Sequence, residues 1–421
     1  MLKDLIQMML RRRGKKEVVP IKQLEINSLC FDGEARISYS FHVELQSPVK
    51  LLAFNKALNP SLEGKGWQIK SRVERGLGWA TLRIAYSRGE FAEAKGRVEG
   101  GVEDFTLSAY GVRSGRALLK DETIWHPIPA EDLVAWGFRG RLEKYRISAA
   151  KSPGCRGRLA APGYEADEGV FEGEALHRSP GLSAIIASYR VSRTESFEVY
   201  SRKGYSRSEV EGIRDLLAEA VTLLSSKGIP APTHSRAVEL WPETDPFAQD
   251  NMVALRPEVL RGASRGEGPA LYEVYTLLGA QASMAAAPES LSDYWVYESL
   301  PEALGMALSV SVGGEALRAA EKRARQLARC VEEYSRKGRL PLLGSGLPRG
   351  RVARAAVRCG APLAFWILAS REGVDALWRL VKCTVSDGVY SEAKIARCAG
   401  EVNARFAEEV LREGRLLEWL S

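Results

Sequence analysis

The chain has 421 residues, of which 45% are hydrophobic and 27% are charged, a composition typical of a globular protein with two or three domains. It has no apolar run of the ~18 residues that a membrane-spanning helix requires. The 60 basic and 53 acidic residues are mixed along the chain and give a net charge of +7. Nucleic-acid binding is therefore permitted, but no cluster of basic and aromatic residues supports it.

Cysteine and histidine usage limits metal and redox chemistry. The six cysteines include no C-x-x-C pair, and only four histidines are present, so zinc-ribbon spacing is absent. We expect a cytoplasmic protein with buried free thiols, and Cys383 with Cys398 is the first pair to test for a disulfide. Asn and Gln are scarce while Glu, Arg, Ala and Gly are plentiful, which favours a thermophilic source.

Residues 1–16, MLKDLIQMMLRRRGKK, form a basic N-terminal tail or helix. The apolar stretch precedes the charges, which is the reverse of the order in a secretory signal. A solvated tail and an amphipathic helix that touches a membrane or a partner are both open interpretations.

Residues 17–193 have the pattern of a β-sheet domain. Segments such as LEINSLCF, ARISYSFHVEL and WATLRIAYS alternate or cluster β-forming residues between Gly, Pro, Asp and Ser breaks. Their spacing predicts antiparallel strands packed as a sandwich or a saddle. The stretch Ser152–Gly169 is rich in Gly and Pro and is expected to be a loop.

From residue 194 to 421 the hydrophobic period changes to 3.6 residues. SRSEVEGIRDLLAEAVTLLSSKG predicts an amphipathic helix with Ser206 or Ser208 as its N-cap and Gly228 at its end. SRAVELW and DNMVALRP predict strands, and an Arg-rich helix from Gly314 opens a helical part over about 314–421. The predicted class is therefore α+β: a β domain, then an α/β domain that ends in helices.

The stretch 272–304, YEVYTLLGAQASMAAAPESLSDYWVYESLPEAL, is predicted to form two helices joined at Pro288-Glu289-Ser290. The second helix carries Glu298 among aromatic and apolar residues, and a buried carboxylate must find a partner or become neutral. We therefore expect Glu298 to be protonated or to accept a hydrogen bond from the hydroxyl of Tyr272 or Tyr275.

The run DYWVYESLPEAL resembles a signature of the gluzincin aminopeptidases, the membrane alanyl aminopeptidase family. In that family a Glu on a D-x-W-x-N-E-G-type helix is the third zinc ligand; Glu298 falls on it, preceded by Asp293 and Trp295. The family's H-E-x-x-H helix has its counterpart, by spacing, in the Tyr-Thr-Leu-Leu-Gly run at 275–279. The resemblance implies an antiparallel β saddle domain followed by a thermolysin-like α/β domain with helices at its end.

The departures from the family's motif have chemical consequences. Tyr275 and Gly279 stand where the resemblance places two imidazole ligands, and Thr276 stands where it places the general base, so we expect no zinc and no other cofactor. A shift of three residues puts Glu273 at the position of the base, but it supplies no histidine and breaks the spacing to Glu298.

Two further family motifs have degraded counterparts. Ala248-Gln249-Asp250-Asn251 resembles the G-x-M-E-N strand, which binds the N-terminus of a peptide. Downstream, VRCGA at 357–361 matches only the Gly and Ala of Y-x-K-G-A, with Val357 where the family has a tyrosine that supports the transition state. The candidate peptide-groove residues are Asp250, Asn251, Glu273, Glu298 and Tyr272.

The resemblance therefore favours a non-catalytic pseudo-peptidase that binds an extended peptide or a protein partner. One alternative is a metallo-aminopeptidase with an atypical site. Another is a scaffold subunit of a larger assembly, with the basic tail or the Arg-rich helix as its contact surface. His234, just before SRAVELW, is expected to have a structural role.

Overall fold

The computed structural model of the chain describes residues 20–31, 34–44, 49–55, 61–63, 67–74, 79–86, 91–101, 117–119, 128–129, 141–149, 157–176, 182–202, 204–242, 244–285, 290–291, 294–335, 339–343, 352, 355–386 and 389–420. The basic segment 1–16, the break at 286–289 and Asp293 lie outside these residues. The chain divides into two compact units, Met1–Arg190 and Val191–Ser421.

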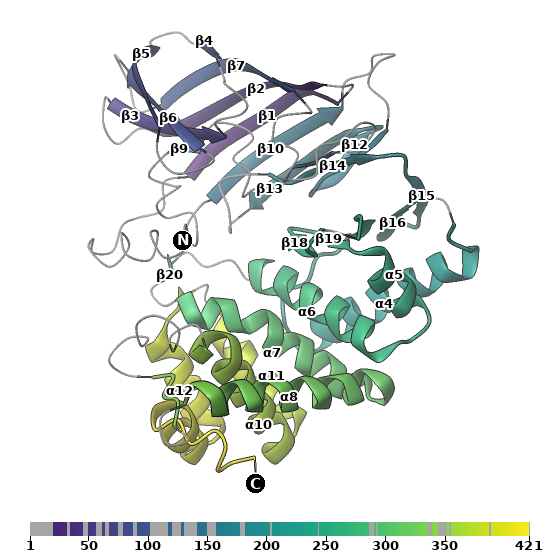
Figure 1. Ribbon diagram of the computed structural model, residues 1–421, viewed down its shortest axis with the longest axis vertical. Coiled ribbons are helices and arrows are strands. Elements are labelled where there is room, and N and C mark those ends of the chain that lie inside the picture. The colour runs from purple at the N-terminus through teal and green to yellow at the C-terminus, as the bar shows by residue number, and fades with distance from the viewer. Residues whose placement is uncertain are drawn as a thin grey trace. The chain divides into compact units, whose positions relative to one another are not determined.

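The described residues of the first unit form β-sheets (Figure 1). A seven-stranded sheet has the order β12-β13-β10-β1-β2-β7-β4, a four-stranded sheet the order β5-β6-β3-β9, and a three-stranded sheet the order β11-β14-β8. The strands are β1 (Pro20–Phe31), β2 (Glu34–Glu44), β3 (Val49–Asn55), β4 (Ser61–Glu63), β5 (Trp67–Glu74), β6 (Trp79–Tyr86), β7 (Phe91–Gly101), β8 (Ala117–Leu119), β9 (Ile128–Pro129), β10 (Arg141–Ala149), β11 (Arg158–Ala160), β12 (Tyr164–Asp167), β13 (Val170–Leu176) and β14 (Ala184–Ala187).

Two features of this unit differ from the sequence-based expectation. Strand β1 pairs with β10 in parallel, whereas the other described pairings of the unit are antiparallel. A long connection between the two strands makes a parallel pair possible. Part of the expected loop Ser152–Gly169 forms strands β11 and β12, because backbone pairing with β14 and β13 organises a segment of weak β-propensity.

The second unit contains a five-stranded sheet of order β15-β16-β17-β19-β18. Strands β16, β17 and β19 pair in parallel, and β18 pairs antiparallel with β19 as the outermost described strand. Strands β20 and β21 form a separate parallel pair. The strands are β15 (Arg190–Arg193), β16 (Phe197–Ser201), β17 (Ser235–Glu239), β18 (Phe247–Gln249), β19 (Met252–Leu255), β20 (Ser290–Leu291) and β21 (Val389–Tyr390).

Helices form most of the described residues of the second unit and share its buried core with the five-stranded sheet. They are α4 (Arg207–Ser226), α5 (Pro257–Ser264), α6 (Gly268–Ala285), α7 (Tyr294–Val312), α8 (Gly314–Tyr334), the π-helical turn η3 (Ala356–Gly360), α10 (Ala361–Glu372), α11 (Val374–Val385), α12 (Glu392–Val402) and the π-helical turn η4 (Phe406–Arg412). Among the residues that the structure describes, no helix is long and apolar enough to cross a membrane.

Local sequence explains where several helices begin. Ser206 caps α4 by accepting a hydrogen bond from the Glu209 backbone N–H, and the Glu209 carboxylate accepts one from the Ser206 backbone N–H. At the start of α12 the Ser391 hydroxyl accepts a hydrogen bond from the Lys394 backbone N–H. On α8 the small residues Ala316, Ala320 and Ala324 are buried. Alanine at such spacing gives a helix a narrow apolar face and lets neighbouring helices come close.

Two disulfides join elements of the helical part. Cys330 on α8 is bonded to Cys359 in η3, and Cys383 on α11 to Cys398 on α12, with Cα–Cα distances of 6.1 and 5.8 Å. The expectation of free thiols was therefore wrong for these four cysteines, although the second pair is the one that the sequence singled out. Helix packing brings these cysteines together, and spacing in the sequence does not report such proximity.

Candidate functional site

Helices α6 and α7 come into direct backbone contact at two glycines. A methyl group at Gly279 of α6 would lie 2.6 Å from the carbonyl oxygen of Pro301 and 2.8 Å from Cβ of Leu304. On α7, a methyl group at Gly305 would lie 2.5 Å from Oγ1 and 2.9 Å from Cα of Thr276. Contacts below 3.0 Å with backbone atoms leave no space for a side chain at either position. We call this contact, formed by Gly279, Gly305, Thr276 and Pro301, the α6–α7 seam.

The seam bears directly on the expected metal ligands. The imidazole that the gluzincin motif requires at position 279 would have to occupy the space of the α7 backbone. Thr276, at the position of the general base, lies against Gly305, and its hydroxyl donates a 2.9 Å hydrogen bond to the carbonyl oxygen of Tyr272. The residues at these positions therefore do not fit a zinc ion with two imidazole ligands.

Tyr275 lies in the core with 1% of its surface exposed. Burial raises the pKa of its hydroxyl to about 12, and the negative charge of Glu219 on α4 contributes to the same shift. A phenol with this pKa is neutral near pH 7. Its ring packs in the apolar cluster with Leu278 and Val274, as a structural residue does.

Tyr272 takes part in a contact that the sequence did not predict. Its hydroxyl donates a 3.0 Å hydrogen bond to Glu302 on α7, one helical turn beyond Glu298. The guanidinium of Arg323 on α8 donates to the same carboxylate at 2.6 and 3.3 Å. Burial, together with the adjacent Glu302 carboxylate, raises the pKa of Tyr272 well above its usual value. This three-helix cluster of Tyr272, Glu302 and Arg323 has no counterpart in the sequence-based prediction, because its members are too far apart in the chain for a local pattern to indicate it.

The side chain of Glu298 lies outside the described residues, although its backbone belongs to α7. Its expected hydrogen bond with Tyr272 or Tyr275 therefore stays a prediction.

Glu273 on α6 lies beside Arg256, whose Nη2 donates to its carboxylate at 3.4 Å. Burial raises the pKa of Glu273, and the Glu258 carboxylate adds to the rise, while Arg256 opposes it. The carboxylate is half-buried and held by a cation that joins the end of β19 to α6.

Asp250 and Asn251 form the turn between β18 and β19. Asp250 adopts a φ of 49°, a left-handed backbone conformation that Asp and Asn tolerate better than most residues. Helix α6 contacts both strands of this hairpin, as Figure 1 shows. The candidate residues Asp250, Asn251, Tyr272 and Glu273 therefore belong to adjoining elements of one unit.

Val357 lies in the π-helical turn η3, half-buried against the apolar core. An isopropyl group there contributes packing and cannot donate the hydrogen bond that the family's tyrosine supplies.

Two further carboxylates of the five-stranded sheet are held in ion pairs. Glu239, 2% exposed, accepts hydrogen bonds from Arg202 Nε and Nη2 at 3.0 and 2.8 Å. Glu198 lies 2.9 Å from Nε of Arg193 and accepts a 2.6 Å hydrogen bond from Nε of Arg236. Nε2 of His234 is 3.4 Å from Glu198, which gives that histidine a place in the sheet's polar cluster.

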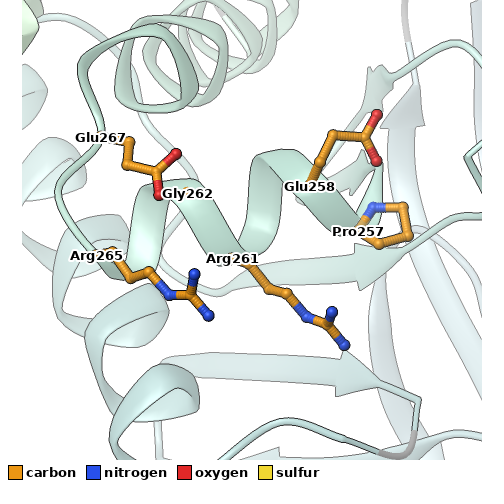
Figure 2. A pocket seen from close by; sticks show the side chains of 6 residues that line it. All are labelled: Pro257, Glu258, Arg261, Gly262, Arg265 and Glu267. Carbon is orange, nitrogen blue, oxygen red and sulfur yellow. The ribbon is translucent and has the colours of Figure 1, made fainter.

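A cavity of about 410 Å³ lies along α5. Its lining residues are Pro257, Glu258, Arg261, Gly262, Arg265 and Glu267. Figure 2 shows the guanidinium groups of Arg261 and Arg265 on one side of the helix and the carboxylates of Glu258 and Glu267 on the other. Arg265 pairs with Glu209 at 3.0 Å, and Arg261 lies 4.9 Å above the ring of Tyr205. None of the predicted site residues lines this cavity.

Within the described part of the chain, no group of three or more His, Cys, Asp or Glu side chains is arranged to hold a metal ion.

Comparisons with known proteins show which solved structures have a similar fold. No family profile and no curated protein matches the sequence. The solved structure of yeast LTA4 hydrolase in complex with bestatin is similar, with a TM-score of 0.67 and 10% identity over 97% of this chain and 72% of that chain. An M1 zinc metallopeptidase from Deinococcus radiodurans is similar with a TM-score of 0.56 and 12% identity, over 96% and 94% of the two chains. The same enzyme bound to a Tyr-Ser-Ala substrate gives 0.56 and 13%, over 94% and 95%.

At these identities the similarity establishes the fold alone. The chain has a mixed α/β fold like that of the M1 zinc metallopeptidases, which is the coarse expectation that the gluzincin resemblance carried.

Proposed function

We propose that this chain is a non-catalytic, aminopeptidase-like protein that has lost zinc and the general base and binds an extended peptide or protein segment. The α6–α7 seam carries the proposal. A zinc aminopeptidase needs two imidazoles on the first helix, whereas Gly279 is in contact with the backbone of α7 and Thr276 with Gly305.

Peptide binding is supported by the arrangement of the hairpin. Strand β18 is the outermost described strand of its sheet, and α6 packs against β18 and β19. An extended peptide adds to the edge of a sheet through backbone hydrogen bonds, which do not depend on a metal. Asp250, in the turn after β18, would attract the amino terminus of such a peptide.

Metal content and turnover test the loss of catalysis. Purified full-length protein is expected to contain far less than one zinc per chain by mass spectrometry and to release no product from aminoacyl p-nitroanilides. Stoichiometric zinc, together with turnover that a chelator abolishes, would overturn this half of the proposal and revive an atypical metallo-aminopeptidase.

Fluorescein-labelled hexapeptides test the binding half. Peptides with free amino termini are expected to bind more tightly than their N-acetylated counterparts, and Asp250→Asn is expected to remove that difference. Gly400→Ala, which changes a residue with open space around it on α12, serves as the matched control. Equal affinity for free and acetylated peptides in the unmodified protein would contradict the role of Asp250.

A further inference from the structure

Helix α8 carries a line of exposed cations on the face opposite its buried residues. Arg318, Lys322, Arg325 and Arg329 are all exposed, whereas Ala316, Ala320, Ala324, Leu327 and Val331 are buried. The intervals between the four cations are four, three and four residues. At 3.6 residues per turn, these positions lie within an arc of about 60° and extend over about 16 Å. We call these four residues the α8 stripe.

The stripe differs from the exposed faces of α4, α12 and η4 in how its charges are paired. On α4, Arg207 pairs with Glu211 at 2.8 Å, and on α12 Arg397 lies 3.8 Å from Glu401. In η4, Arg405 pairs with Glu409 at 2.8 Å. On α8, Arg318 pairs with Glu315, but among the described residues no carboxylate forms an ion pair with Lys322, Arg325 or Arg329.

The sequence of α8 places like charges where they repel. Arg318 and Lys322, and also Arg325 and Arg329, are four residues apart, and Lys322 and Arg325 are three apart. Like charges at these spacings destabilise a helix. Glu321 and Glu333 stand four residues from Arg325 and Arg329 without an ion pair to either. An anionic partner along the stripe would relieve this repulsion.

Helix α8 is fixed in place from two sides. Arg323 donates to Glu302 of α7 at 2.6 Å, and the disulfide between Cys330 and Cys359 ties the end of the helix to η3. The stripe therefore belongs to an element whose orientation is set by the core of its unit, so binding there would not require α8 to become ordered.

We propose that the α8 stripe is a docking surface for an acidic helix of a protein partner, one whose carboxylates recur at intervals of four and three residues. The mean interval of about 3.5 residues keeps a row of side chains facing a second helix that runs alongside. None of the exposed residues of α8 is aromatic, so the stripe lacks the stacking groups typical of single-strand nucleic-acid sites. Nor does α8 carry an exposed large hydrophobic residue that would enter a membrane.

The probe is a fluorescent, alanine-based helical peptide with four Glu residues at the 4-3-4 spacing. Two competitors accompany it: a peptide of the same composition with the Glu residues spread around the helix, and a 20-base-pair DNA duplex. Fluorescence anisotropy with the full-length protein at about 50 mM salt keeps screening low. The matched peptide is expected to bind several-fold more tightly than the spread peptide.

Two variants, each with two charge reversals, distinguish an effect of the α8 stripe on binding from an effect of the protein's net charge. Lys322→Glu with Arg325→Glu is expected to weaken binding of the matched peptide by about tenfold, since each exposed ion pair contributes modestly. Arg207→Glu with Arg397→Glu changes the net charge by the same amount on exposed positions of α4 and α12. This control is expected to change the affinity for the matched peptide by less than about twofold.

Four outcomes would overturn the proposal: no binding of the matched peptide, equal binding of the two peptides, tighter binding of DNA, or equal weakening by both variants. Tighter binding of DNA would identify the stripe as a phosphate-binding surface instead. Binding of the hexapeptides with free amino termini should be unaffected by either variant, so this test and that of the peptide site can fail separately.

Discussion

Gly279 lies where α6 and α7 are closest, and its substitution tests the seam. Gly279→Ala places a methyl group 2.6 Å from the carbonyl oxygen of Pro301. A helix normally gains up to about 1 kcal/mol from Gly to Ala, but overpacking against backbone costs about 1–3 kcal/mol. We expect a net loss in the free energy of unfolding, measured by urea denaturation.

The matched control is Gly400→Ala in the interior of α12. Outside its chain neighbours and its own helix backbone, no atom of the described residues lies within 4 Å of the methyl group that it adds, so only the gain in helix propensity applies. If Gly279→Ala were as stable as Gly400→Ala, the seam would have room for a side chain, and the argument against a second imidazole at this position would fail.

Glu198 makes the stability of the five-stranded sheet dependent on pH. Burial by itself raises the pKa of this carboxyl, but His234, Arg236 and Arg193 outweigh burial and lower the pKa to about 2 from a usual 4.5. Because the folded pKa is the lower one, the stabilisation is present above about pH 4.5 and is lost as the pH falls towards 2. The shift corresponds to about 3 kcal/mol.

Urea denaturation between about pH 2 and 6 measures this contribution. Glu198→Gln is expected to lose about 3 kcal/mol or more at pH 6, because the fully buried Arg236 would lose its ion pair with this carboxylate. Its stability should then vary less with pH than that of the unmodified protein. Parallel pH profiles for the two proteins would show that Glu198 is not the group responsible.

At the scale of elements, the disulfides join helices that are consecutive or distant in the chain. Cys383 and Cys398 are 15 residues apart and connect α11 to α12. Replacing both with Ser is expected to lower the free energy of unfolding by about 3 kcal/mol, since the cross-link restricts the unfolded chain. Replacing Cys330 and Cys359, which are 29 residues apart, should have an equal or slightly larger effect.

Denaturation with and without reductant measures both pairs. The reductant should destabilise the unmodified protein and leave a variant that lacks all four cysteines unchanged. A thiol titration of the unfolded, unreduced protein that finds all six cysteines free would contradict both disulfides.

Helices and strands with a strong local sequence signal were predicted more accurately than those with a weak one. The 3.6-residue period and the Ser206 cap predicted α4 to within a few residues of its observed bounds. The helical part predicted over about 314–421 is not helical to its end, because the π-helical turn η4 ends at Arg412 and turns follow. Gly414 there has a φ of 74°, which a helix does not accommodate.

At the scale of the whole molecule, a protein can share the fold of zinc enzymes without sharing their catalytic chemistry. The similar solved structures are 10–13% identical to this chain, a level at which the backbone is kept while most side chains differ. The seam lies in α6 and α7, the two helices to which the gluzincin resemblance assigns the metal. Under the proposed function, the fold has kept the two helices and closed the space between them.

The sequence by itself determined elements with a strong local signal, such as α4, because hydrophobic period, caps and breaks are local properties of the chain. It also indicated the metallopeptidase fold through a short run around Glu298, and the similar solved structures confirm that fold. Only the tertiary structure decided that Gly279 meets the backbone of α7, that Tyr272 donates to Glu302 and that Cys330 bonds to Cys359. Each of these contacts joins residues more than twenty positions apart, and no local pattern records which distant residues the packing of helices brings together.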